Sequence, residues 1–134
     1  MHHLPDPERA KPCILVVDDD DAIALAIAAR LGTDFRVVGL ADPALAVQRA
    51  RAEGADVILC DIDMPGLRGD DVAFALSQDP ATAGIPLLYL TGLVSPDEVP
   101  EFEGVFGEHR TLSKGASTEA LREAVGDALG LPRD

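Results

Sequence analysis

The sequence predicts a single-domain α/β protein built as a doubly wound (βα)5 parallel sheet. Short apolar runs of strand length alternate along the chain with segments of helical periodicity. The 134 residues fall in the size range of one compact domain. Because aromatic residues make up only 4% and tryptophan is absent, we expect a core of Ala, Val, Ile and Leu, which suits strands packed between helices.

Five runs are predicted to form the strands, and three of them contain a stretch that is apolar throughout. Ile14 to Val17, Val57 to Cys60 and Leu87 to Leu90 show no polar alternation, as is typical of central parallel strands that are covered on both faces. The other two runs are more polar and are expected at the edges of the sheet. In chain order, the runs are CILVV (13–17), FRVVGL (35–40), DVILC (56–60), PLLYL (86–90) and HRTLS (109–113).

Helices are predicted in the segments between the strands. Apolar residues recur at helical spacing at positions 23, 27 and 31, after an acidic cap at 20 or 21, and again at 121, 125 and 129. Segments 43–53 and 70–78 are helical by composition, with Asp42 and Asp70 as the expected N-caps. Pro96, Pro100, Gly104 and Gly107 interrupt residues 92–107, so we expect the fourth helix to be short or mobile.

Polar residues follow four of the predicted strands at their carboxyl ends. Asp18 and Asp19 follow the first strand, Asp61 the third, Thr91 the fourth and Lys114 the fifth. The carboxyl ends of parallel strands lie along one edge of the sheet, with neighbours about 4.8 Å apart, so we expect these side chains to converge on one pocket.

Each residue type in this set suits phosphoryl transfer. Asp61 is the expected nucleophile, because a carboxylate can attack a phosphoryl group and form an acyl phosphate. Asp18, Asp19 and Asp61, with the backbone carbonyl of Asp63, are the expected ligands of Mg²⁺, which prefers oxygen atoms. Lys114, one of only two lysines beside nine arginines, would neutralise the phosphoryl oxygens, and Thr91 would hydrogen-bond one of them.

Four motifs, ILVVDD, VILCDIDMPG, LLYLTG and TLSKG, resemble in order and spacing the receiver domains of response regulators, such as chemotaxis regulators. The resemblance covers residues 12–130 and implies a flavodoxin-like sheet with strand order 2-1-3-4-5. It implies Asp61 as the phosphoacceptor, the pair Asp18 and Asp19 with the Asp63 carbonyl as metal ligands, and Thr91 and Lys114 as switch and clamp.

The resemblance further implies a sensor histidine kinase or histidine phosphotransfer protein as donor, and a change of shape on phosphorylation as the signal. Such a domain catalyses only its own phosphorylation and dephosphorylation. Segment 92–129 is the expected contact for a second copy or a downstream protein. A stand-alone regulator, a phosphate shuttle and a part of a longer regulator or hybrid kinase are all compatible with this sequence.

Three positions depart from the family pattern, and one of them is Asp63, an acidic side chain two residues beyond the expected phosphoacceptor that we expect to tune the lifetime of the acyl phosphate. Gly115 follows the lysine, where the family usually has a proline in a cis bond, so we expect a looser loop. Thr111 stands where an aromatic residue is often coupled to the switch threonine, so the switch must use another readout.

Charge and composition exclude several function classes. A net charge of −13 repels a phosphate backbone, so direct binding of nucleic acid is not expected. The sequence has no apolar run of membrane-spanning length and no secretory signal, so a cytoplasmic location is expected. Residues 1–11 are expected to be a flexible leader and 131–134 a tail. Cys13 and Cys60 are expected to be free and buried, since the predicted strand places them too far apart for a disulfide.

Two alternative functions remain. A pseudo-receiver would keep the fold as a protein-interaction module without phosphorylation. A haloacid-dehalogenase-like phosphatase would use Asp61 as nucleophile and Asp63 as general acid, because VILCDIDM matches its Asp-x-Asp strand. The position of Asp18 and Asp19 before the nucleophile argues against the phosphatase.

Overall fold

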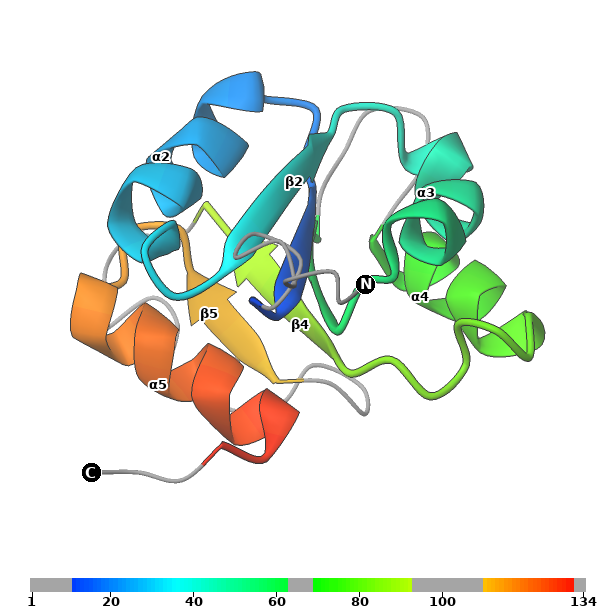
Figure 1. The fold of residues 1–134 in the computed structure, drawn as a ribbon. Helices are drawn as coiled ribbons and strands as arrows, with labels where there is room; N and C mark the ends of the chain where they lie inside the picture. Colours follow the sequence, from blue (N-terminus) through cyan, green and yellow to red (C-terminus); the bar gives the residue numbers. More distant parts are fainter. Residues whose placement is uncertain (1–10, 63–68, 93–109, 132–134) are drawn as a thin grey trace, which may run out of the picture.

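The computed structural model describes residues 11–62, 69–92 and 110–131. These residues form five strands, four α-helices and one short 3₁₀ helix, arranged as a sheet between two helical layers (Figure 1). In chain order the elements are β1 (Cys13–Val17), α2 (Asp21–Leu31), β2 (Arg36–Leu40), η1 (Pro43–Leu45), α3 (Ala46–Glu53), β3 (Val57–Asp61), α4 (Gly69–Gln78), β4 (Leu87–Thr91), β5 (Thr111–Ser113) and α5 (Thr118–Leu129).

The sheet is parallel and has the order β2-β1-β3-β4-β5, which confirms the expected order 2-1-3-4-5. The three apolar runs form the central strands β1, β3 and β4, and every residue of these strands is buried. The two more polar runs form the edge strands, as expected. Of the fifth run, residues 110–113 are described, and Thr111–Ser113 of these form the strand.

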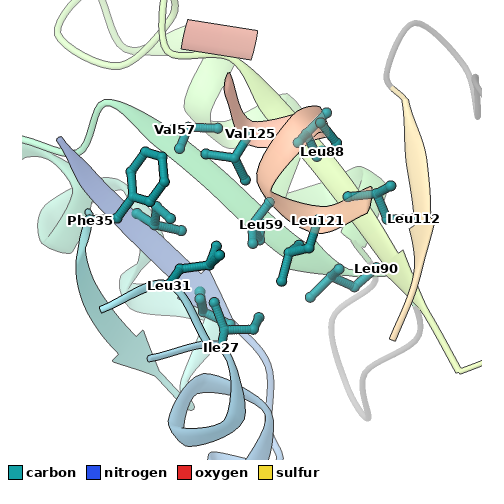
Figure 2. Packing of buried hydrophobic residues seen from close by; sticks show 13 residues of the cluster. Ile27, Leu31, Phe35, Val57, Leu59, Leu88, Leu90, Leu112, Leu121 and Val125 are labelled. Atoms are coloured by element: carbon teal, nitrogen blue, oxygen red, sulfur yellow. The ribbon is translucent and has the colours of Figure 1, made fainter. Parts of the chain in front are cut away.

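Helices α2 and α5 cover one face of the sheet, and α3 and α4 cover the other (Figure 1). Alternate strand residues point to the two faces, so each face has its own apolar cluster. Figure 2 shows the first cluster, in which Leu31 of α2 and Val125 of α5, both fully buried, pack over Leu59 of β3. Burying one such side chain contributes about 1.5 to 3 kcal/mol, so this packing fixes both helices against the sheet.

Two of the three predicted helix N-caps are confirmed. The side chain of Asp20 accepts a hydrogen bond from the backbone N–H of Ala22, and that of Asp42 accepts one from Ala44, so these residues cap α2 and η1. The prediction that Asp70 is an N-cap is wrong. Helix α4 already begins at Gly69, which makes Asp70 its second residue.

The predicted irregular fourth helix falls on residues 92–107, of which all but Gly92 lie outside the described residues. The leader 1–11 lies outside them too, except for Lys11, as does the tail 131–134, except for Leu131. Among the helices of the described residues, none has the length and apolar character needed to cross a membrane.

Candidate functional site

Asp18 lies directly after β1, at the carboxyl edge of the sheet. Its backbone N–H donates to the carbonyl of Leu40 at 3.1 Å, which extends the pairing of β1 with β2 by one residue. Its Oδ1 atom accepts a hydrogen bond from the backbone N–H of Asp20 at 2.9 Å. Asp18 is buried at this turn, whereas Asp19 is exposed. The turn into α2 therefore holds one carboxylate inside the edge and leaves the next one open to solvent.

Asp61 and Thr91 are the last residues of the neighbouring strands β3 and β4. Both are buried, although both are polar. Asp61 pairs with Leu90 in the sheet register, and the N–H of Ile62 donates to the carbonyl of Leu90 at 2.9 Å. This bond carries the strand pairing past Asp61, so the backbone at the end of β3 is fixed where its carboxylate reaches the edge.

Lys114 follows β5 and brings a positive charge to the same edge. Its backbone N–H donates to the carbonyl of Thr91 at 2.8 Å. Its ammonium Nζ lies 2.8 Å from Oδ2 of Asp18 and 3.4 Å from Oδ2 of Asp61. The Lys114 side chain is 20% exposed, against 1% for Asp18 and 6% for Asp61. One lysine thus bridges two carboxylates that are 43 residues apart in the sequence.

These contacts control the charge state of Lys114. Burial acts to lower the pKa of its ammonium, but the contact with Asp18 and the charges of Asp18 and Asp61 outweigh burial. The pKa of Lys114 is therefore raised above its ordinary value. At neutral pH the side chain is a fixed cation at the centre of the site.

The acidic cluster consists of Asp18, Asp19 and Asp61. Each residue offers one carboxylate oxygen, and these three atoms all lie within 4.8 Å of one another. Within the described residues, the buried Oδ2 of Asp18 accepts no hydrogen bond of standard geometry, and its contact with the Lys114 ammonium is an ion pair. Three carboxylates against one ammonium leave an excess of negative charge. This donor set fits a hard divalent cation, which would supply the missing positive charge.

The thiol of Cys60 lies next to Asp61 but takes no part in the acidic cluster. Cys60 is fully buried, and its Sγ donates to the backbone carbonyl of Asp61 at 3.4 Å. Burial first, and then the charges of Asp61 and Asp18, raise the pKa of the Cys60 thiol to about 12. Cys13 is also buried and free, so the prediction that the two cysteines form no disulfide is confirmed.

The structure brings Asp18, Asp19, Asp61 and Lys114 together and places Thr91 at the same edge, as the strand ends predict. The roles of these five residues stay predictions. The carbonyl of Asp63, predicted as a metal ligand, lies outside the described residues.

Two further residues near the site were missed from the sequence. Ser113 accepts a hydrogen bond from the N–H of Gly115, and Arg30 donates to the carbonyl of Ala116. The second contact joins residues 86 positions apart, so no local pattern could predict it.

Known sequences resemble this chain over most of its length. A family model described as the response regulator receiver domain matches residues 14–126. The response regulator PleD of Caulobacter vibrioides is 38% identical over 81 residues, which make up 60% of this chain and 18% of PleD. The DNA-binding dual master transcriptional regulator RpaA of Synechocystis is 39% identical over 120 residues, which make up 85% of this chain and 47% of RpaA. The chain thus spans less than half the length of these two relatives.

Solved structures resemble the fold as well. The chemotaxis protein CheY4 of Vibrio cholerae aligns with a TM-score of 0.73 and 28% identity, covering 89% of this chain and 99% of CheY4. A response regulator structure from Chloroflexus aurantiacus aligns with the same score and identity. The acidic pocket of Asp18, Asp19 and Asp61 fits the phosphoacceptor site of such domains. The family match over residues 14–126, supported by the strand order and by these structures, shows that the chain belongs to the response regulator receiver domain family.

Proposed function

We propose that Asp61 accepts a phosphoryl group, in a Mg²⁺-dependent reaction, from a sensor histidine kinase or a histidine phosphotransfer protein. One observation carries the proposal: the ammonium of Lys114 lies 3.4 Å from the Asp61 carboxylate and 2.8 Å from that of Asp18. A cation so placed can meet an incoming phosphoryl group beside the nucleophile. The acidic cluster supplies the rest of the site.

The proposed chemistry uses the described residues in distinct roles. A carboxylate oxygen of Asp61 forms a bond to phosphorus while the bond from phosphorus to the donor's imidazole nitrogen breaks, and the imidazole leaves with that electron pair. The ammonium of Lys114 turns from the carboxylates to the phosphoryl oxygens and offsets their charge. Thr91 donates its hydroxyl hydrogen to one of these oxygens. The domain thereby catalyses only its own phosphorylation and the later hydrolysis.

Asp18, Asp19 and Asp61 would hold the Mg²⁺, with the backbone carbonyl of Asp63 as a further proposed ligand. When bound, the ion would withdraw electron density from the phosphoryl oxygens and reduce the repulsion between two anions. The excess negative charge around Lys114 supports this assignment.

We expect Asp19→Asn to weaken Mg²⁺ binding by about tenfold, or about 1.4 kcal/mol, because it removes one anionic oxygen from the cluster. Asp19 is exposed, so the fold should tolerate the change. Thermal unfolding at increasing Mg²⁺ concentration measures the affinity, since a ligand of the folded state raises the Tm. Asp21→Asn is the matched control, because Asp21 is exposed on α2 and lies outside the cluster. Equal Mg²⁺ dependence in both variants would remove Asp19 from the ligand set.

The proposed donor docks against α2, which begins beside the acidic cluster. Four of the six exposed residues of this helix are apolar, the exceptions being Asp21 and Arg30, and Leu25 is 70% exposed. The helix also presents Ala22, Ala26 and Ala29 to solvent. A protein that carries phosphohistidine must approach this edge to reach Asp61, so an apolar surface that starts there suits a donor helix.

We expect Leu25→Glu to slow phosphoryl transfer from a phosphorylated histidine phosphotransfer domain by at least about tenfold, because a charge would be buried in the contact. Labelling by acetyl phosphate should stay at the wild-type rate, since this small donor needs no docking surface. Phe74→Glu is the control, because Phe74 is 66% exposed on α4, over the opposite face of the sheet. Equal slowing by both substitutions would argue against docking on α2.

The remaining proposals concern the limits and surroundings of the domain. We place the receiver domain at residues 12–130, between a leader and a tail, in the cytoplasm. Segment 92–129 is the proposed contact for a second copy or a downstream protein after the change of shape. Thr111 is buried on β5, and its hydroxyl has no hydrogen-bond partner among the described residues. Because threonine has no aromatic ring, the switch here would proceed without the movement of one.

Intact-mass analysis after incubation with acetyl phosphate and Mg²⁺ tests the central proposal. We expect a mass increase of one phosphoryl group that requires Mg²⁺ and is reversed by hydroxylamine, which cleaves acyl phosphates. An unmodified chain would point to the pseudo-receiver, an interaction module without phosphorylation. Steady turnover of p-nitrophenyl phosphate would point to the phosphatase.

A further inference from the structure

The loop from Ser113 to Ala116 carries Lys114 from β5 toward helix α5. Three hydrogen bonds join this loop to the ends of β4 and β5. The N–H of Lys114 donates to the carbonyl of Thr91. The N–H of Gly115 donates to the hydroxyl of Ser113 at 3.0 Å, and the N–H of Ala116 donates to the carbonyl of Ser113 at 3.0 Å. Ser113 thus accepts from both residues that follow Lys114. A hydroxyl that accepts from the N–H two residues ahead closes a tight turn.

Arg30 holds the same loop from the opposite side. Its Nη1 donates to the carbonyl of Ala116 at 3.0 Å, and its own carbonyl accepts a hydrogen bond from Arg122 of α5 at 3.4 Å. Arg30 lies in the last turn of α2. The guanidinium therefore ties the end of the loop to a helix that is itself packed against the sheet.

Side-chain packing leaves unfilled space beside this loop. A cavity of about 30 Å³ lies against it, lined by Ile23, Ile27 and Arg30 on one side and by Ser113, Lys114 and Ala116 on the other. Glycine at 115 and alanine at 116 offer little side chain to fill it. No peptide bond of the described residues is cis, so no cis proline braces the turn. The hydrogen bonds of the loop therefore help to set where the backbone of Lys114 lies.

We propose that Ser113, assisted by Arg30, is a positioning residue that holds the ammonium of Lys114 between Asp18 and Asp61. Only one part of this inference rests on the proposed function, namely the expected effect on the rate of phosphorylation. Its structural part, the placement of one ammonium, can be measured in the unphosphorylated protein. Neither residue touches the reacting atoms, so each acts through Lys114.

Lysine acetylation measures the placement directly, because the chain contains only two lysines. Lys114 is held by two carboxylates at the carboxyl ends of the strands, whereas Lys11 precedes β1 at the other end and serves as an internal reference. At a low concentration of acetic anhydride and a temperature well below the Tm, Ser113→Ala should raise the acetylation of Lys114 relative to Lys11 by at least about threefold. Ser113→Thr retains the hydroxyl and should keep the wild-type ratio.

Matched variants separate positioning from a general loss of stability. Ser77→Ala removes a serine hydroxyl from α4, and Arg51→Ala removes an exposed arginine from α3, and both should leave the acetylation ratio unchanged. Arg30→Ala should raise it, by less than Ser113→Ala, because its contact is exposed. An unchanged ratio in Ser113→Ala overturns the proposal.

The rate of labelling by acetyl phosphate provides the functional readout. We expect Ser113→Ala to slow labelling by about three- to tenfold and Ser113→Thr to restore it. In a Lys114→Gln background, Ser113→Ala should have no further effect, because it acts through that lysine. An equal slowing in both backgrounds would refute the positioning role. If the wild-type chain is not labelled at all, the proposed function fails, while the acetylation ratio still decides the placement of Lys114.

Discussion

Asp61→Asn should reduce labelling by acetyl phosphate and Mg²⁺ by at least about 10³-fold, because the substitution removes the nucleophile. The amide oxygen is a poor nucleophile and forms no stable acyl phosphate. Asn has nearly the same shape as Asp, so the buried end of β3 should keep its packing. Intact-mass analysis over time measures the rate, and peptide mapping of the wild type locates the modified residue.

The same substitution should not destabilise the fold. Three carboxylates share a space in which their oxygens lie within 4.8 Å, so removal of one charge relieves repulsion in the metal-free protein. We expect an equal or higher urea midpoint for Asp61→Asn than for the wild type. Asp21→Asn, with the same change of charge on an exposed residue, should be labelled normally. Full labelling of Asp61→Asn would place the phosphoacceptor elsewhere.

Lys114→Gln is expected to have the second-largest effect, because it removes the cation that bridges Asp18 and Asp61. Loss of one preorganised charge at a reacting group lowers rates by about 100-fold, and we expect labelling to slow by that order. Removal of one partner of a fully buried ion pair costs about 3 to 5 kcal/mol. Lys114 is 20% exposed, so we expect a loss of about 1 to 3 kcal/mol in the free energy of unfolding at neutral pH.

The direction of the pKa shift of Lys114 determines how this loss of stability depends on pH. The pKa of Lys114 is raised in the folded state, so its stabilising contribution is complete below the ordinary lysine pKa and is lost as the pH rises through the folded-state value. The stability gap between wild type and Lys114→Gln should therefore persist at neutral pH and narrow in strong alkali. Added Mg²⁺ should stabilise the variant more than the wild type. Lys11→Gln is the control for the loss of one positive charge.

The central part of the fold could be predicted from the sequence because its signal is local. Runs without polar alternation specify strands that are covered on both faces, and all residues of β1, β3 and β4 are buried. The first and last residues of helices and strands were harder to predict where local signals compete. Asp70 suits an N-cap by composition, yet α4 begins one residue earlier at Gly69. The predicted fifth strand covers 109–113, and among its described residues the three of β5 pair with β4.

The candidate site was predictable for a related reason. Asp18, Asp61, Thr91 and Lys114 each end or follow a strand, and the geometry of a parallel sheet brings strand ends to one edge. The support of Lys114 was not predictable in this way. The contact of Arg30 with Ala116 depends on how α2 packs beside the loop after β5, and that packing has no counterpart in the local sequence.

The buried thiol beside the proposed phosphoacceptor has a consequence for the durability of the signal. An ionised sulfur at Cys60 could attack the carbonyl carbon of an acyl phosphate on Asp61, which would expel phosphate and leave a thioester. A thiol with a pKa of about 12 stays protonated at neutral pH and is a weak nucleophile. We therefore expect hydrolysis by water, and not internal thiolysis, to remove a phosphoryl group from Asp61.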